Sequence, residues 1–190
     1  MYHKGLNRQL IIDTAAEMIS TDGLEKFSLH SLASKLGVRT ASLYTHVSGL
    51  DDVVTEVGLY ALNLQKDAQM SRMEGKTGKD AVFAVAEGYR AFALENKEFY
   101  KIIMNMQSVN EQLKKGSITL SQPPMEALRT YPLNEDEIMH WQRILRSIMH
   151  GFVDHEHSGY FIHFEQPKEE SYRMAVQCFV DGLEAYISQR

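Results

Sequence analysis

The 190-residue sequence predicts an all-α protein of about nine helices, in which a three-helix domain with a helix-turn-helix precedes a larger helical body. Three observations predict this fold. Apolar residues recur at helical spacing along most of the chain, without strand alternation. Two short amphipathic segments meet at Gly37, as in a helix-turn-helix. The hydrophobic content of 44% is that of a globular protein, and no apolar run approaches the ~20 residues that span a bilayer.

The first three expected helices form the small domain. Residues 10–19 carry one apolar stripe, and Gly23 ends that helix. The second helix follows Ser28, whose hydroxyl can cap free amide groups, and it stops at Gly37, where a left-handed backbone is often needed. The third helix, within residues 38–47, keeps three apolar side chains inside. It turns hydroxyl, imidazole and guanidinium groups outward, and these groups can bond phosphates and base edges.

A fourth expected helix starts near Gly49 and connects the small domain to the body. Asp51 and Asp52 lie in its first turn, where negative charge complements the helix dipole. Residues 71–79 contain two glycines and no periodic apolar face, which predicts a linker. The predicted domains are therefore residues 1–48 for the helix-turn-helix domain, residues 49–70 for the connecting helix, and residues 71–190 for the body.

The body is expected to consist of further helices. Apolar stripes over residues 82–93 and 99–106 predict two of them, whereas prolines make residues 116–132 less regular. Residues 134–137 predict a capping box at the head of a long helix, and a last helix follows Pro167.

The last two helices are the expected dimer interface. Two from each subunit would form a four-helix bundle around a two-fold axis. DNA geometry also favours a homodimer, because two DNA-binding domains (the DNA readers) must reach half-sites roughly 34–36 Å apart, or a multiple of that distance. The spacing of the apolar residues along these two helices also allows both helices to pack inside one subunit. The residues expected at the interface are Leu145, Phe152, Tyr172, Val176, Phe179, Leu183 and Ile187.

The net charge of −5 is unevenly distributed along the chain. Residues 1–48 hold five basic and four acidic residues, giving +1, and residues 49–190 hold fifteen and twenty-one, giving −6. DNA binding needs a local positive face rather than a positive protein. This modest patch predicts moderate affinity and a low salt dependence. Its expected sources are Lys4, Arg8, Lys35 and Arg39.

Catalytic and metal-site patterns are missing from the sequence. It has no glycine-rich phosphate loop after a strand and no nucleophile elbow, so neither an enzyme nor a cofactor is expected. His150 and Asp154 share a helix face, but a second well-spaced pair is lacking, so no metal is expected at this histidine-rich end, which also holds His155, His157 and His163. Cys178, the only cysteine, has apolar neighbours that predict a packed thiol. Without a hydrophobic signal segment, a cytoplasmic protein is expected, with no membrane partner.

Residues 27–47, FSLHSLASKLGVRTASLYTHV, resemble the DNA-binding domain of TetR/AcrR-like bacterial transcriptional regulators. The matching residues, in order, are Ala33, Leu36, Gly37, Val38, Leu43, Tyr44, His46 and Val47. Farther along, residues 98–104, 150–151, 159–161 and 181–184 resemble the family branch named for a tryptophan, a histidine and a glycine. The resemblance implies a dimeric repressor on a pseudo-palindromic double-stranded DNA operator, released by a small-molecule effector that the sequence does not identify.

The family's DNA contacts map onto the third helix and its flanks. In this mapping Arg39 and Thr40 would face base edges, and Tyr44 would reach a phosphate. The full set implied is Ser28, His30, Arg39, Thr40, Ala41, Ser42, Tyr44, Thr45 and His46. The family's common lysine at the head of the fourth helix is missing from residues 48–50, although exposed amides there could bind a phosphate. A ligand sensor or scaffold of this fold that has lost DNA binding is therefore the alternative hypothesis.

The resemblance also implies an effector cavity among the body helices. Aromatic and methionine side chains are the candidates to line it, although apolar stripes of this kind also form ordinary core. The candidate residues are Tyr89, Phe92, Tyr100, Met104, Trp141 and Met149.

Overall fold

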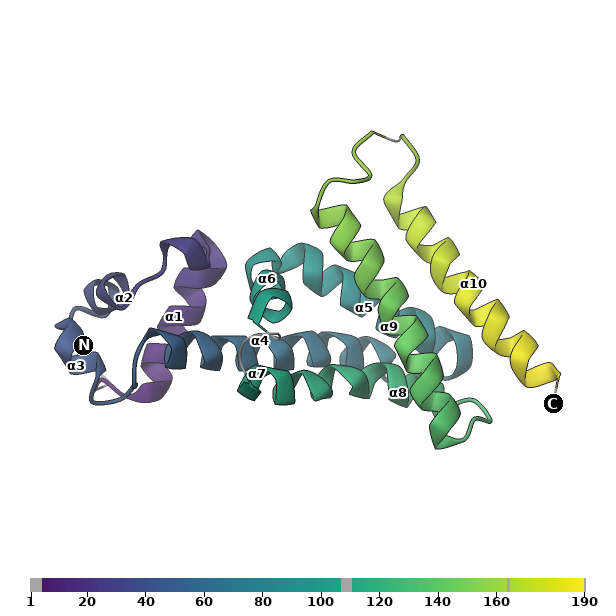
Figure 1. Cartoon of the computed structure of the whole chain (residues 1–190), viewed down its shortest axis with the longest axis horizontal. Coiled ribbons are helices and arrows are strands. Elements are labelled where there is room, and N and C mark those ends of the chain that lie inside the picture. Colours follow the sequence, from purple (N-terminus) through teal and green to yellow (C-terminus); the bar gives the residue numbers. More distant parts are fainter. Residues whose placement is uncertain (1–4, 107–110, 164, 190) are drawn as a thin grey trace. The chain divides into compact units, whose positions relative to one another are not determined.

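The computed structural model describes residues 5–106, 111–163 and 165–189 (Figure 1). These residues form ten α-helices and two short 3-10 helices without any strand, which confirms the all-α prediction. No helix among them is long and apolar enough to cross a membrane. In chain order the helices are α1 (Arg8–Asp22), η1 (Leu24–Lys26), α2 (Leu29–Leu36), α3 (Thr40–Leu43), α4 (Leu50–Met73), α5 (Gly78–Glu95), α6 (Lys97–Met106), α7 (Glu111–Gly116), η2 (Ser117–Ser121), α8 (Gln122–Leu128), α9 (Glu135–His157) and α10 (Lys168–Ser188).

The chain divides into two compact units. The first unit comprises Met1–Leu64 and Glu95–Ser117, and the second comprises Gln65–Leu94 and Ile118–Arg190. Helix α4 contributes residues to both units. It continues to Met73, so the non-helical part of the expected linker is shorter than the sequence suggested, and covers residues 74–77.

Local capping sets the helix boundaries in the first unit. The hydroxyl of Ser28 accepts a hydrogen bond from the Ser31 N–H at 3.1 Å, and the Ser31 hydroxyl accepts one from the Ser28 N–H. Gly37 has a φ of 68°, in the left-handed region that side chains disfavour. The Val38 N–H closes back on the Ala33 carbonyl at 3.0 Å, the pattern of a Schellman C-cap. The predicted cap and turn of the helix-turn-helix are therefore confirmed.

The core of the first unit extends from α1 to α6 and α7. Tyr60 on α4 meets Phe99 on α6 edge to face, with ring centroids 6.0 Å apart. A Cβ at Gly58 would lie 2.7 Å from the side chain of Leu113, so this glycine lets α4 and α7 pack closely. The fully or nearly fully buried side chains on α1, α2 and α3 are Ile11, Ala15, Ile19, Leu32, Ala33 and Leu43.

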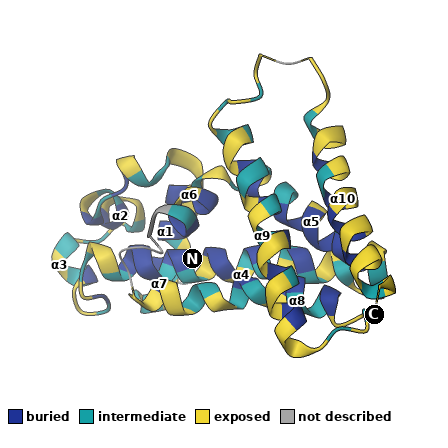
Figure 2. Ribbon diagram, turned by 45° about the vertical axis from the view of Figure 1, so that its right-hand side comes forward, coloured by how far each residue is buried: buried dark blue, intermediate teal, exposed yellow. Residues whose placement is uncertain are grey.

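In the second unit α9 and α10 run side by side and direct their buried faces inward (Figures 1 and 2). Asn134 and Glu137 form the predicted capping box of α9. The buried hydroxyl of Tyr172 donates to the Ala86 carbonyl at 2.7 Å, which fixes α10 against α5. Burial also raises the pKa of this phenol far above its ordinary value.

Helix α8 lies where the sequence predicted irregular structure. Pro123 and Pro124 occupy its first turn and are buried. Proline is tolerated there because the first amides of a helix have no intrahelical acceptor. The prolines thus begin a helix instead of interrupting one.

Candidate functional site

Helix α3 is short and is held by two buried side chains. Leu43 is fully buried and Val47 is 3% exposed. The N–H groups of His46 and Val47 both donate to the Leu43 carbonyl, at 2.9 and 3.0 Å, and continue the turn beyond the helix. These anchors fix which side of α3 faces outward.

The outward side of α3 carries most of the predicted DNA contacts. Arg39 and Tyr44 are exposed, and the exposed fraction of Tyr44 reaches 58%, which is high for a tyrosine. His30, Ala41 and Thr45 are exposed as well. The remaining members of the predicted set are half-buried, namely Ser28, Thr40, Ser42 and His46. All of them belong to the first compact unit.

Arg8 has a different role from the one expected. Its guanidinium makes two hydrogen bonds with Asp52, at 2.6 and 2.9 Å, and one with Glu56 at 2.8 Å. It also donates to the His46 carbonyl at 3.1 Å, at the end of the outward turn. The hydrogen bonds from Arg8 hold the pKa of Asp52 well below its usual range. The prediction that Arg8 contributes to a positive face is wrong, because two carboxylates neutralise it; we call this group the α1–α4 clamp (Arg8, Asp52 and Glu56).

The remaining basic residues give the helix-turn-helix domain little positive charge. Lys35 lies 3.5 Å from Glu17 in an exposed ion pair. Arg39 is exposed and in no ion pair among the described residues, whereas Lys4 lies outside them. The expectation of exposed amides at the head of α4 fails for Ser48, whose N–H donates to Asp52 at 2.8 Å.

The effector candidates fall into both compact units. Tyr100 and Met104 lie on α6 in the first unit, and the other four lie in the second. Tyr89 and Met149 are buried, and the Tyr89 hydroxyl lies 3.4 Å from His150 Nδ1. Trp141 instead packs between α9 and α10, with its ring 5.4 Å from that of Phe179. Phe92, 3% exposed, belongs to the buried face of α5.

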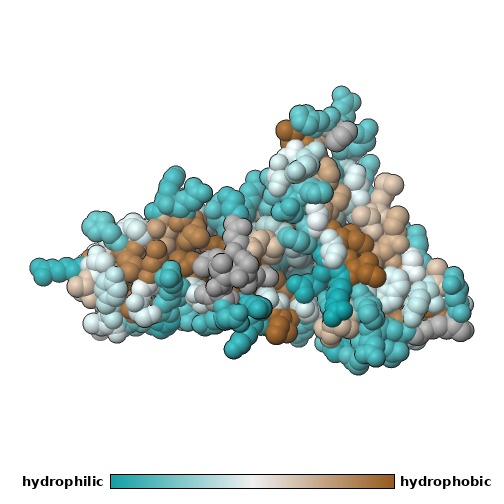
Figure 3. Space-filling model, in the orientation of Figure 1, coloured by the Kyte–Doolittle hydropathy of each residue, from teal (hydrophilic) through white to brown (hydrophobic). Residues whose placement is uncertain are grey.

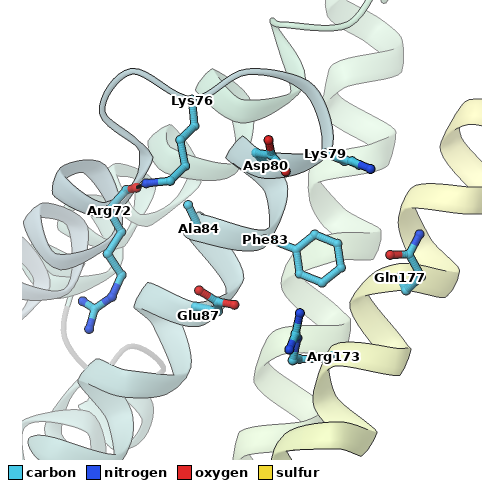
Figure 4. A pocket seen from close by; sticks show the side chains of 9 residues that line it. All are labelled: Arg72, Lys76, Lys79, Asp80, Phe83, Ala84, Glu87, Arg173 and Gln177. Carbon is cyan, nitrogen blue, oxygen red and sulfur yellow. Dashed lines mark hydrogen bonds between the residues drawn. The ribbon is translucent and has the colours of Figure 1, made fainter.

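A polar hollow of about 530 Å³ lies where the turn after α4 approaches α5 and α10 (Figure 4). It lies within the second unit, and none of the predicted effector residues lines it. Figure 4 shows the Phe83 ring between Lys79 and Arg173. The charged side chains around it are exposed, which is typical of a solvated surface. The lining consists of Arg72, Lys76, Lys79, Asp80, Phe83, Ala84, Glu87, Arg173 and Gln177.

The residues expected at a dimer interface mostly pack inside the single chain. Phe152 and Ile187 are half-buried. The others are at most 4% exposed, namely Leu145, Tyr172, Val176, Phe179 and Leu183. Cys178, expected to be packed, is exposed on α10. The neighbouring valine and phenylalanine lie on the opposite, buried face, which is why the local sequence suggested a packed thiol.

Sequence reasoning missed a set of polar side chains in the interior of the second unit. Gln65 and Gln69 on α4 are 0% and 1% exposed, and Gln142 on α9 is 4% exposed. Arg146 lies four residues after Gln142, on the same side of α9. The detectable signal was a pair of polar residues four apart within an apolar stripe, on each of the two helices.

Comparison with known proteins agrees with this architecture. Residues 82–179 match the model for the C-terminal domain of tetracyclin repressor-like proteins. The HTH-type transcriptional regulator YobS of Bacillus subtilis (strain 168), itself uncharacterised, is 28% identical over 180 residues, covering 94% of this chain and 93% of YobS.

Solved structures share the fold. A Rhodococcus sp. RHA1 protein of unknown function superimposes with a TM-score of 0.76 and 19% identity, covering 95% of this chain and 97% of the other. ActR of Streptomyces coelicolor, in complex with (S)-DNPA, gives a TM-score of 0.65 and 17% identity, covering 96% and 98%. The family model, which spans more than half of the chain, makes the protein a regulator and not an enzyme. The chain belongs to the TetR family of HTH-type transcriptional regulators.

Proposed function

We propose that the protein is a dimeric repressor that binds a pseudo-palindromic DNA operator and leaves it when a small-molecule effector binds. The observation that carries the proposal is the outward side of α3, with Arg39 and Tyr44 exposed while Leu43 and Val47 anchor the helix. Exposed guanidinium, hydroxyl and aromatic groups on a short helix after a tight turn suit base and phosphate contacts in the major groove. Such an operator would be read in the cytoplasm, where bacterial DNA lies.

Arg39 is the side chain that we assign to base recognition. Its guanidinium can donate two hydrogen bonds to a guanine, and no carboxylate competes for it among the described residues. Replacing Arg39 with Ala should lower discrimination at one base-pair position by about 1–3 kcal/mol. Lys35→Ala is the matched control, because Lys35 is exposed but already paired with Glu17. The control should weaken binding slightly and equally for all sequences.

The experiment is binding of the purified protein to labelled fragments of its own upstream region at several salt concentrations. Saturable binding to one pseudo-palindromic fragment, with the expected loss in Arg39→Ala, supports the repressor. With the α1–α4 clamp neutralising Arg8, the salt slope should indicate well under ten phosphate contacts per subunit. If Arg39→Ala kept the DNA sequence preference of the unmodified chain, Arg39 would not be the residue that recognises a base.

We place the dimer interface on the exposed sides of α9 and α10. Ile144 and Met174 are 46% and 68% exposed, and apolar groups gather over α9 in Figure 3. Gly151 and Gly182 lie mid-helix, and a Cβ there would meet nothing within 4 Å. A mid-helix glycine costs about 1 kcal/mol relative to alanine, and close approach of a helix from a second copy would explain both.

Sedimentation equilibrium tests this interface. The unmodified chain should be a dimer, and Ile144→Glu should dissociate it, because a carboxylate would be buried without a partner. Ile118→Glu is the control, since Ile118 is 71% exposed but lies outside both helices, on η2. If both variants dimerised equally well, the interface would lie elsewhere than on α9 and α10.

Effector release would follow if the effector binds more tightly to a conformation whose readers do not fit the operator. ActR, which shares the fold, has been solved with the small molecule (S)-DNPA.

We also assign the chain to the branch of the family that is named for a tryptophan, a histidine and a glycine. The assignment rests on the pair His150-Gly151 and on the segment Gly159-Tyr160-Phe161.

The alternative is a sensor of the same fold that no longer binds DNA. It is favoured by the weak positive charge around α3 and by residues 48–50, which lack the lysine that the family commonly has at the head of this helix. A selection from random DNA sequences separates the two functions. Enrichment of a palindromic motif supports the repressor, and failure to enrich any motif supports the sensor.

A further inference from the structure

The interior of the second unit contains side-chain amide groups that no described residue satisfies. Within the described ranges neither the Nε2 nor the Oε1 atom of Gln65 has a hydrogen-bond partner, although the residue is fully buried. Gln69 donates to the Val85 carbonyl at 3.2 Å, but its Oε1 has no partner. The Oε1 of Gln142 is likewise unpaired. Such groups are rare inside proteins because each costs about 1–3 kcal/mol.

Arg146 adds a charge without a counter-charge to the same unit. It is half-buried, and its guanidinium donates a hydrogen bond to the Ser121 hydroxyl, at 2.7 Å. It takes part in no ion pair among the described residues. Burial lowers the pKa of its guanidinium, as expected for a cation removed from water without a compensating anion.

Arg90, in the same unit, is an arginine with a structural role and provides a comparison for Arg146. Its guanidinium makes two hydrogen bonds with the Glu156 carboxylate, at 2.8 and 2.9 Å. The two side chains are 17% and 9% exposed, so the pair is internal and compensated. No described carboxylate pairs with Arg146 as Glu156 pairs with Arg90, which leaves its guanidinium available to an anion from outside the chain.

The remaining contacts connect these groups through α5. The Val85 carbonyl receives the Gln69 amide, and Tyr89 lies one turn later on the same helix. The Tyr89 hydroxyl lies 3.4 Å from His150 Nδ1, and His150 is one turn after Arg146 on α9. Helix α5 therefore contacts polar groups of both α4, through Gln69, and α9, through His150, while Gln65 and Gln142 lie one turn before Gln69 and Arg146 on their helices.

We propose that Arg146 and the buried glutamines form the recognition site for an organic monocarboxylate. The carboxylate would pair with the Arg146 guanidinium, while the amides of Gln142 and of the α4 glutamines would bond neutral oxygen or N–H groups of the same ligand. A single guanidinium among neutral amides matches one negative charge better than the two of a phosphate. The proposal deepens the proposed function, because it rests on the second unit holding the effector.

The test compares small acids with their amides, which have similar shape but no charge. The probes are acetate, butyrate and benzoate against acetamide, butyramide and benzamide, at pH 7 and equal ionic strength. At ten times its Kd, a bound acid should raise the thermal unfolding midpoint by about 3–6 °C. The matching amide should leave the midpoint unchanged.

Two variants locate the site. Arg146→Met should lose the response to acids, yet unfold at the same or a higher temperature without ligand, because an uncompensated charge is removed. Arg143→Met is the matched control: this exposed arginine is three residues earlier on α9, and the variant should respond to acids as the unmodified chain does.

The proposal is overturned if no acid exceeds its amide on the unmodified chain, or if Arg146→Met keeps the response. A lower midpoint of Arg146→Met without ligand would assign Arg146 a structural role instead and would also overturn it. Operator binding is measured on the same preparations. A chain that responds to acids but binds no DNA would retain this site and refute the repressor, whereas the reverse pattern would refute this site alone.

Discussion

The α1–α4 clamp makes a quantitative prediction about the DNA reader. Arg8 and Asp52 are 44 residues apart and share two hydrogen bonds, of 2.6 and 2.9 Å. Their side chains are 42% and 21% exposed, so solvent screens the pair in part. We expect a coupling energy of about 1 kcal/mol, between the 0–1 of exposed pairs and the 1.5–3 of hydrogen bonds to charged groups.

The assay is a double-mutant cycle with Arg8→Met, Asp52→Asn and the double variant, using urea unfolding at pH 7. Each single variant should lose stability, and the double variant should lose less than the sum of the two. The Asn side chain can still accept the Ser48 N–H, so the cycle isolates the ion pair from the cap of α4.

The pair formed by Lys35 and Glu17 provides the control for this cycle. Its atoms are 3.5 Å apart, and its side chains are 53% and 66% exposed. The cycle with Lys35→Met and Glu17→Gln should therefore give a coupling near zero. If the two cycles gave equal couplings, or if the clamp gave less than about 0.3 kcal/mol, the reasoning from geometry and burial would be refuted.

Three further predictions follow from the same structure. Because the pKa of Asp52 is lower in the folded state, its stabilisation is complete above about pH 4 and is lost as the pH falls further; urea midpoints should show a smaller difference between the unmodified chain and Asp52→Asn at pH 2.5 than at pH 7. Gly88→Ala should lower the free energy of unfolding by about 1–3 kcal/mol, because its Cβ would lie 2.8 Å from the Gln69 Cα; an unchanged midpoint would contradict this close approach of α4 and α5. Ser28→Ala should cost about 1 kcal/mol in thermal unfolding, since the Ser31 N–H loses its cap, whereas Ser28→Asn should restore most of it.

Local signals predicted the helix-turn-helix well. The cap at Ser28, the left-handed turn at Gly37 and the inward Leu43 each depend on residues a few positions away, and all three match the structure. The hydrophobic stripes of α9 and α10 were also predicted, because a buried helix face leaves a clear period in the sequence.

Features that depend on distant or unusual contacts were not predicted. The sequence offers no direct sign that Arg8 meets carboxylates more than 40 residues away, so its charge was assigned to DNA. Helix α8 was missed because prolines were interpreted as breaks when they begin the helix. Arg146 and Gln65 were missed because hydrophobic periodicity treats every polar residue as exposed.

The exposed position of Cys178 has a practical consequence. It is the chain's only cysteine and lies on the outer side of α10, one turn from both Met174 and Gly182, so in the proposed dimer it would lie within the interface, where a label would interfere with dimerisation. Replacing Cys178 with Ser gives a background free of thiols, into which a cysteine can be introduced near α3. Pulsed spin resonance on such samples would then measure directly how far the two DNA readers move apart when an acid is added.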